Sequence, residues 1–240
     1  MIAVDMAQPP TMTSGLVFFI AFVAAIVTSQ ATARGATQRP DAAQAPPAGW
    51  RDATRTTLDL TLAGKHDDVI AMYESWVAKY PSFAEAHVML AGAYEAKARD
   101  LLVKRVPDAG GAAMSLFKHS AAHLRRAFEL GGDPRTVVRP LIDIYGPVGL
   151  NQPDEQARAI RDAVGRYPAD ALAESEFIGL LVARRESIDA ALTSARTALA
   201  KDPNARLEYA ESLLRLAQRA PEPYRGQLLG EAERIIGKAK

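Results

Sequence analysis

Prolines recur along this chain at a spacing close to a fixed period. Pro81, Pro134, Pro168 and Pro203 are separated by 53, 34 and 35 residues. Each follows a segment in which apolar residues recur three and four positions apart, as on one face of an amphipathic helix. Because proline cannot continue a helix, each one marks the end of such a segment. A period near 34 residues predicts stacked helix-turn-helix repeats.

The composition fits a folded helical chain and excludes several kinds of chemistry. The 240 residues are 48% hydrophobic and 24% charged, so most of the chain should fold. The net charge of +1 leaves no basic footprint of the kind that nucleic-acid binding requires. Because the chain has no cysteine, disulfides, thiolate metal sites and a thiol nucleophile are excluded.

An uncharged apolar segment precedes the repeats. Residues 16–27 read LVFFIAFVAAIV, and Ala31 and Ala33 follow in a small-residue pattern that signal peptidases cleave. This apolar run suits a signal peptide better than a membrane span of about 20 residues. However, the first basic residue is Arg34, after the run, and residues 14–33 are long enough for an anchor with the rest of the chain in the cytoplasm.

We therefore expect residues 1–33 to be a signal peptide or a membrane anchor, with neither as the remaining alternative. The protein would then be exported to the periplasm or anchored in a membrane. Residues 34–49 read RGATQRPDAAQAPPAG, without apolar periodicity, which predicts a disordered Pro/Ala-rich linker. The folded repeat domain is expected over residues 50–240.

Residues 64–81 resemble the second half of a tetratricopeptide repeat (TPR). Gly64 is the turn glycine, Val69 and Ile70 the apolar pair, Tyr73 the aromatic and Pro81 the closing proline. Further units in phase begin near residues 84, 135, 169 and 204, so the resemblance covers about residues 50–240. It implies an all-α, right-handed superhelical array of about five helix-turn-helix repeats. An irregular helical bundle is the alternative.

The second repeat is longer than the others. The spacing of 53 residues exceeds the 34-residue period by 19, and the surplus falls around residues 99–113. Pro107, Gly110 and Gly111 indicate a turn there. We expect a helical hairpin longer than its neighbours, which is either a tolerated surface insertion or a contact element.

The sequence contains no convincing catalytic, cofactor or metal motif. His119 and His123 are four positions apart and so share a helix face, but the run HSAAH lacks an acidic residue between them and lies among basic side chains. His66 and His87 occupy repeat positions where packing residues are expected. We therefore predict a non-enzymatic protein without cofactors.

In the family that the chain resembles, the first helix of each repeat lines a groove for partner peptides. The corresponding positions are candidate partner contacts, and they are Val88, Glu95, Arg139, Asp143, Glu176, Leu180 and Arg184. This set has mixed charge and lacks the Lys, Arg and Asn clamp with which some members hold acidic C-terminal peptides. We expect a protein-interaction scaffold that binds a peptide or helix of a partner. The alternatives are a self-associating structural subunit of a membrane-associated complex and a helical enzyme subunit with a groove site.

Overall fold

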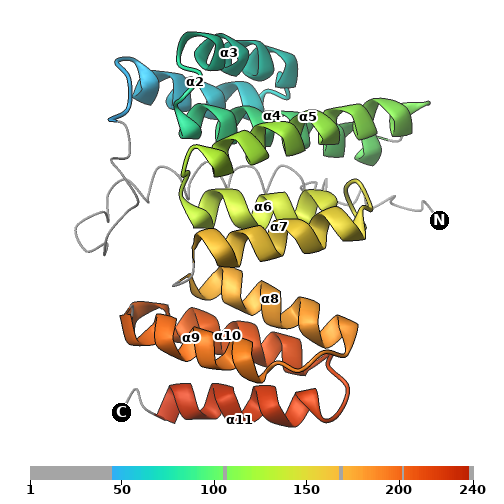
Figure 1. The fold of residues 1–240 in the computed structure, drawn as a ribbon. Coiled ribbons are helices and arrows are strands. Elements are labelled where there is room, and N and C mark those ends of the chain that lie inside the picture. Colours follow the sequence, from blue (N-terminus) through green and yellow to red (C-terminus); the bar gives the residue numbers. More distant parts are fainter. Residues whose placement is uncertain (1–44, 105–106, 168–169, 202, 238–240) are drawn as a thin grey trace, which may run out of the picture. The chain divides into compact units, whose positions relative to one another are not determined.

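The computed structural model describes residues 45–104, 107–167, 170–201 and 203–237. The predicted segment over residues 1–33 and most of the predicted linker lie outside these ranges. Regular structure within them is entirely helical, without strands, which confirms the all-α prediction (Figure 1). The α-helices are α2 (Trp50–Leu62), α3 (His66–Lys79), α4 (Ala84–Val103), α5 (Ala109–Glu129), α6 (Pro134–Tyr145), α7 (Pro153–Arg166), α8 (Ala171–Arg184), α9 (Asp189–Lys201), α10 (Arg206–Ala217) and α11 (Tyr224–Gly237). None of these helices is long and apolar enough to cross a lipid bilayer.

The described chain divides into two compact units. Unit 1 contains residues 45–104 and 107–120, and unit 2 contains the described residues from 121 onward. The boundary falls within α5, between Ser120 and Ala121. The prediction of one repeat domain over residues 50–240 stays a prediction.

The helix lengths agree with the position of the surplus residues. Helix α4 has 20 residues and α5 has 21, whereas the remaining α-helices in the described ranges have 12 to 14. The long hairpin follows from helix extension on both sides of the turn at Pro107. The prediction of a longer second hairpin is therefore confirmed.

Unit 1 is organised around Trp50, the first residue of α2. Its indole is 1% exposed and packs edge-on against Trp76 and Phe83, with ring centroids 5.2 and 4.9 Å apart. Tyr73 of α3 is fully buried beside it and shares a hydrogen bond with Thr57. These contacts join α2 and α3, as expected for a hairpin with one apolar face.

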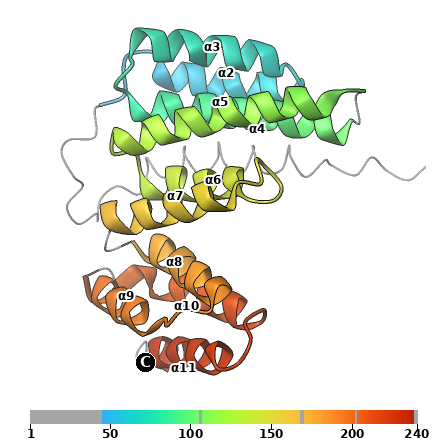
Figure 2. The same cartoon turned by 45° about the vertical axis from the view of Figure 1, so that its right-hand side comes forward.

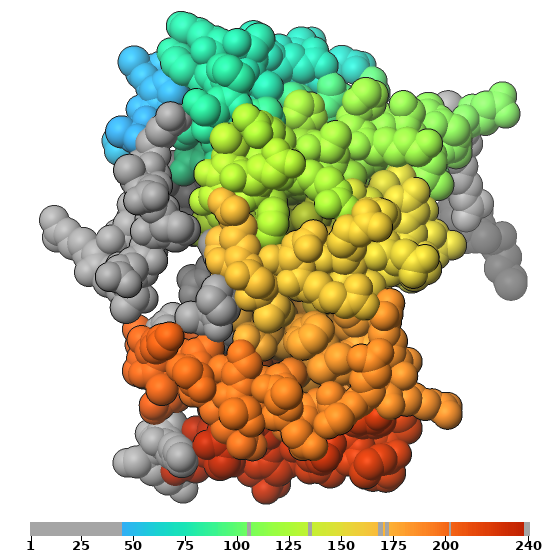
Figure 3. All heavy atoms as spheres, in the orientation of Figure 1, coloured from blue at the N-terminus to red at the C-terminus, as the bar shows by residue number. Residues whose placement is uncertain are grey.

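Unit 2 is built around α8. This helix packs against α6, α7, α9 and α10, and α10 packs against α11 (Figure 2). The small residue Gly179 allows the approach of α8 to α10, because a Cβ there would lie 3.2 Å from Cδ2 of Leu216. Helix α11 forms the last layer of the unit (Figure 3). Residues of α8, α9, α10 and α11 thus share one apolar core.

Local sequence signals position the ends of several helices. Pro153 lies in the first turn of α7, where a missing N–H costs nothing, and Asp154 and Glu155 follow it. Asp170 caps α8 by accepting a hydrogen bond from the backbone N–H of Ala173 at 2.9 Å. The phenol of Tyr167 donates to the carbonyl of Gly132 at 2.7 Å and ties the end of α7 to the turn before α6.

Candidate functional site

Three of the predicted partner contacts come together in unit 2. Arg139 and Asp143 lie one turn apart on α6, and Glu176 lies on α8. Nη1 of Arg139 donates to Oε1 of Glu176 at 2.6 Å, and its Nε donates to both carboxylate oxygens of Asp143 at 3.2 Å. One guanidinium therefore links two carboxylates that lie on the neighbouring helices α6 and α8. We call these three residues the α6–α8 charge cluster.

The electrostatics of the cluster are set by Glu176. Burial raises the pKa of Glu176, and the nearby carboxylate of Asp143 acts in the same direction, while Arg139 and Arg215 of α10 oppose the shift. Burial disfavours the charge of Arg139, but Glu176 and Asp143 together raise its pKa. The contact therefore favours the charge of Arg139, while burial still leaves the pKa of Glu176 above its ordinary value. The side chain of Arg139 is still 52% exposed, so part of its donor capacity faces solvent.

Arg215 extends this polar row onto α10. Its side chain is 65% exposed, and its Nη2 donates to Oγ of Ser212 at 3.0 Å. Because α8 packs against both α6 and α10, Glu176 lies in the field of an arginine from each side. The row therefore runs over the three helices α6, α8 and α10, from Arg139 through Glu176 to Arg215.

The other four predicted contacts have different surroundings. Val88 of α4 is 2% exposed and belongs to the core, so it offers no accessible contact surface. Glu95 of α4 accepts a hydrogen bond from Nε of Arg99 at 2.8 Å, and both lie in unit 1. Leu180 of α8 packs against the core cluster that contains Val138.

Arg184, near the end of α8, is exposed and forms no ion pair with any residue that the structure describes. It is thus the predicted contact with the most freely available charge. Together with Arg215 it supplies exposed guanidinium groups on the neighbouring helices α8 and α10. Of the seven predicted contacts, Arg139, Asp143 and Glu176 thus form the α6–α8 charge cluster, and Arg184 is an exposed arginine without a described ion pair. Val88 and Leu180 are packing residues, and Glu95 is ion-paired within unit 1.

A second polar cluster, which the sequence did not indicate, lies inside unit 2. Glu174 of α8 is fully buried, and Oγ of Ser194 on α9 donates to its Oε1 at 2.6 Å. Its Oε2 has no hydrogen-bond partner among the described residues, and neither has Oη of Tyr209 on α10, which is 1% exposed. Burial raises the pKa of both groups, and the field of Glu174 adds to the shift of Tyr209.

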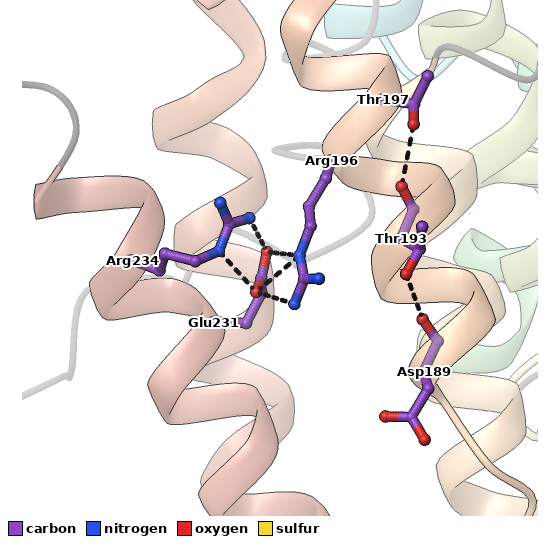
Figure 4. Close-up of polar contacts among 6 residues, drawn as sticks. All are labelled: Asp189, Thr193, Arg196, Thr197, Glu231 and Arg234. Atoms are coloured by element: carbon purple, nitrogen blue, oxygen red, sulfur yellow. Dashed lines mark hydrogen bonds and ion pairs between the residues drawn. The ribbon is translucent and has the colours of Figure 1, made fainter.

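Glu231 of α11 forms the strongest ion-pair arrangement of this unit (Figure 4). Arg196 of α9 donates from Nη2 to its Oε2 at 2.7 Å, and from Nε to both oxygens at 3.1 Å. Arg234 donates from Nε to Oε2 at 3.0 Å and from Nη2 to Oε1. Burial alone would raise the pKa of Glu231, but the hydrogen bonds from Arg234 and Arg196 lower it to about 2.

Both inner carboxylates are buried and do not form an accessible site. The side chain of Glu231 is 2% exposed, and its pair with Arg196 joins α9 to α11, whereas Arg234 lies on α11 itself. In the sequence, Glu174 and Glu231 look like ordinary charged positions of amphipathic helices. Their one distinguishing feature in the sequence is that each lies at a helix position whose spacing predicts burial. That spacing does not identify the side chain with which the buried carboxylate forms a hydrogen bond or ion pair.

The described ranges contain no group of three or more His, Asp or Glu side chains placed to hold a metal ion. The ring of His119 stacks on Tyr94 with centroids 5.2 Å apart. His87 is buried, with Nε2 3.0 Å from the carbonyl of Pro81. Burial lowers the pKa of His66, against the opposing field of Asp100.

Comparison of the chain with protein-family models, curated proteins and solved structures finds no match.

Proposed function

We propose that the chain is a non-enzymatic interaction scaffold of TPR-like repeats in a right-handed superhelical array. Its first helices α6, α8 and α10 would dock a peptide or helix of a partner protein. The packing of α8 against both α6 and α10 supports this arrangement, since it makes the first helices of successive repeats neighbours. Gly179 supports it as well, because a small residue at this position lets α8 approach Leu216 of α10.

The observation that carries the proposal is the polar row on these helices. Arg139 and Arg215 keep 52% and 65% of their side chains exposed while they flank Glu176. Exposed arginines that are already oriented by a carboxylate lose little freedom when they bind, and they can hold a second carboxylate in a forked hydrogen bond. Arg184 adds an exposed guanidinium on α8. A helix or an extended peptide of the partner that carries acidic side chains fits this row.

The surroundings of the ionisable groups favour binding over catalysis. A groove of about 480 Å³ beside α10 and α11 is lined by Leu214, Ala217, Gln218, Arg225 and Leu229. Arg225 is its one ionisable side chain. Two groups with raised pKa, Glu174 and Tyr209, are 0% and 1% exposed, which keeps them from a bound substrate, and a third, Glu176, is held by Arg139. A catalytic acid or base must reach the atom with which it exchanges a proton.

The cellular setting of the scaffold follows from the apolar segment before the repeats. A cleaved signal peptide over residues 1–33 would place the repeats in the periplasm, and an uncleaved one would anchor them at a membrane. Mass spectrometry of the mature N-terminus together with cell fractionation distinguishes the two. A mature chain that begins at Arg34 in a soluble periplasmic fraction supports export, and an intact N-terminus in the membrane fraction supports an anchor.

Site-specific photo-crosslinking in cells tests the docking face. A photoreactive amino acid in place of Arg184 on α8 is compared with the same amino acid in place of Arg158 on α7, which is also exposed. We expect a discrete crosslinked product from position 184 that is absent from position 158. Equal products from both positions, or none from position 184, would contradict the proposed face.

A further inference from the structure

The last hairpin of unit 2, α10 and α11, exposes a row of large apolar side chains. Leu207 is 66% exposed, Leu229 39% and Ile236 47%. Leu214 and Leu229 line the same groove. Leu207 lies seven positions, about two helical turns, before Leu214, and Ile236 lies seven positions after Leu229. Because α10 and α11 run antiparallel, these equal spacings bring Leu207 and Ile236 to the same position along the hairpin. The four residues form one apolar strip along the outer edge of the last hairpin, which we call the terminal strip.

Glycines border the terminal strip on α11. Gly226, Gly230 and Gly237 are spaced by four and seven residues and so share one side of the helix, next to Leu229 and Ile236. A Cβ at Gly230 or Gly237 would meet no atom within 4 Å, and one at Gly226 would meet only the side chain of Glu222.

Packing among the described residues therefore does not require these glycines. Each costs the helix about 1 kcal/mol relative to alanine. A smooth glycine surface beside exposed apolar residues is suited to the close approach of another helix, because it lets two backbones come near each other. The last layer of a repeat array is ordinarily polar on its outer side.

The charges on this face indicate which helix approaches. Arg225 and Glu233 lie four residues before and four residues after Leu229, and both are exposed. Neither forms an ion pair with a described residue, whereas Glu231 and Arg234 of the same helix are fully paired. In an antiparallel pair of α11 helices crossing at Leu229, Arg225 of each copy lies opposite Glu233 of the other. The face is thus complementary to itself under a twofold rotation.

We infer that the chain forms a homodimer through the terminal strip, with two α11 helices packed antiparallel about Leu229 and two symmetric Arg225–Glu233 ion pairs. The centre of the interface, Leu229 of α11, lies on a different helix from the residues of the docking row on α6, α8 and α10. Since it rests mainly on one helix pair, it falls at the small end of stable interfaces, with a dissociation constant on the order of micromolar.

The test is sedimentation velocity on the full-length chain, in detergent if the N-terminus is retained, over a range of concentrations. We expect a reversible monomer–dimer equilibrium. Leu229→Glu should abolish the dimer, whereas Leu62→Glu, at an exposed position of α2 in unit 1, should leave it unchanged. Thermal unfolding of each variant verifies that it folds.

Charge exchange tests the antiparallel geometry. Arg225→Glu alone and Glu233→Arg alone each place like charges opposite each other, and each should weaken the dimer by about tenfold or more. An equal mixture of the two variants should restore dimers, because both pairs in the mixed dimer are then of opposite charge. A monomeric wild type, a dimer that survives Leu229→Glu, or a mixture that does not recover would each overturn the inference. Survival after Leu229→Glu would place the contact elsewhere, such as in residues 16–27.

Discussion

Arg139 of α6 and Glu176 of α8 are 37 positions apart in the sequence and are joined by a 2.6 Å hydrogen bond from Nη1 to Oε1. The bond connects α6 to α8, and it orients the half-exposed guanidinium of Arg139. It also compensates for the burial that raises the pKa of Glu176. The same contact therefore contributes to packing within unit 2 and to the proposed docking row.

Removing Arg139 should destabilise unit 2 slightly. Because its side chain is half exposed, we expect Arg139→Ala to lower the free energy of unfolding by about 0.5–1 kcal/mol. Combining it with Glu176→Gln should cost less than the sum of the two single changes, since the charge that needs Arg139 is gone. Urea unfolding at pH 7 of the four proteins in this cycle measures the coupling. Strict additivity would show that the ion pair contributes nothing.

Glu231 should stabilise unit 2 in a pH-dependent way. Its pKa in the folded state is lowered to about 2 from the ordinary value of 4.5, so its contribution is present above pH 4.5 and is lost as the pH falls toward 2. Glu231→Gln should cost about 2 kcal/mol at pH 7. It should cost progressively less in acid. Thermal unfolding at pH 7 and pH 3 checks this, and an equal loss at both values would exclude the ion pair as its source.

Glu174 should show the opposite pH dependence. Its pKa is raised by burial, so the neutral form is favoured in the folded state, and the penalty appears as the pH rises above the ordinary value of the carboxyl. Glu174→Gln keeps an acceptor for Ser194 and removes the ionisable proton. We expect a gain of about 1 kcal/mol at pH 7 and no gain at pH 3. A loss of stability at pH 7 would show that the ionised form is well satisfied.

Much of the fold could be predicted from the sequence, because its signals are local. The proline period and the 3–4 spacing of apolar residues predicted a helical chain, and the surplus of 19 residues located the long hairpin. Pro153 marked the start of α7 for a stereochemical reason that needs no tertiary information. The arrangement of the repeats as a superhelix stays a prediction.

The site was less accessible to sequence reasoning, because it depends on which faces pack together. Val88 was expected in a groove, yet α4 is buried without interruption from Ala86 to Tyr94, so no periodic exposed face exists there. The pairing of Glu231 with Arg196 joins residues 35 positions apart, on α11 and α9. No spacing rule within one helix predicts such a contact. The joining of Arg139 to Glu176 was likewise outside the prediction, which placed them only on corresponding helices.

Two glycines in unit 2 should respond differently to substitution. A side chain larger than a methyl group at Gly179 would press on Leu216, so Gly179→Leu should separate α8 from α10 and cost about 1–3 kcal/mol. At Gly165 of α7, a Cβ would meet no atom within 4 Å, and Gly165→Ala should stabilise the helix by about 0.5–1 kcal/mol. Thermal unfolding of both variants measures the contrast. Similar effects from both would argue against close α8–α10 packing.

The most direct test of the scaffold account is quantitative affinity capture from the native envelope extract, followed by mass spectrometry. Wild type is compared with Arg184→Glu/Arg215→Glu, which reverses two exposed charges of the docking row. The control is Arg55→Glu/Arg161→Glu, an equal charge change at exposed positions of α2 and α7. We predict a defined partner that the control variant retains and the docking-row variant loses by about tenfold or more. Equal capture by all three proteins, or no specific partner with the wild type, would contradict the account.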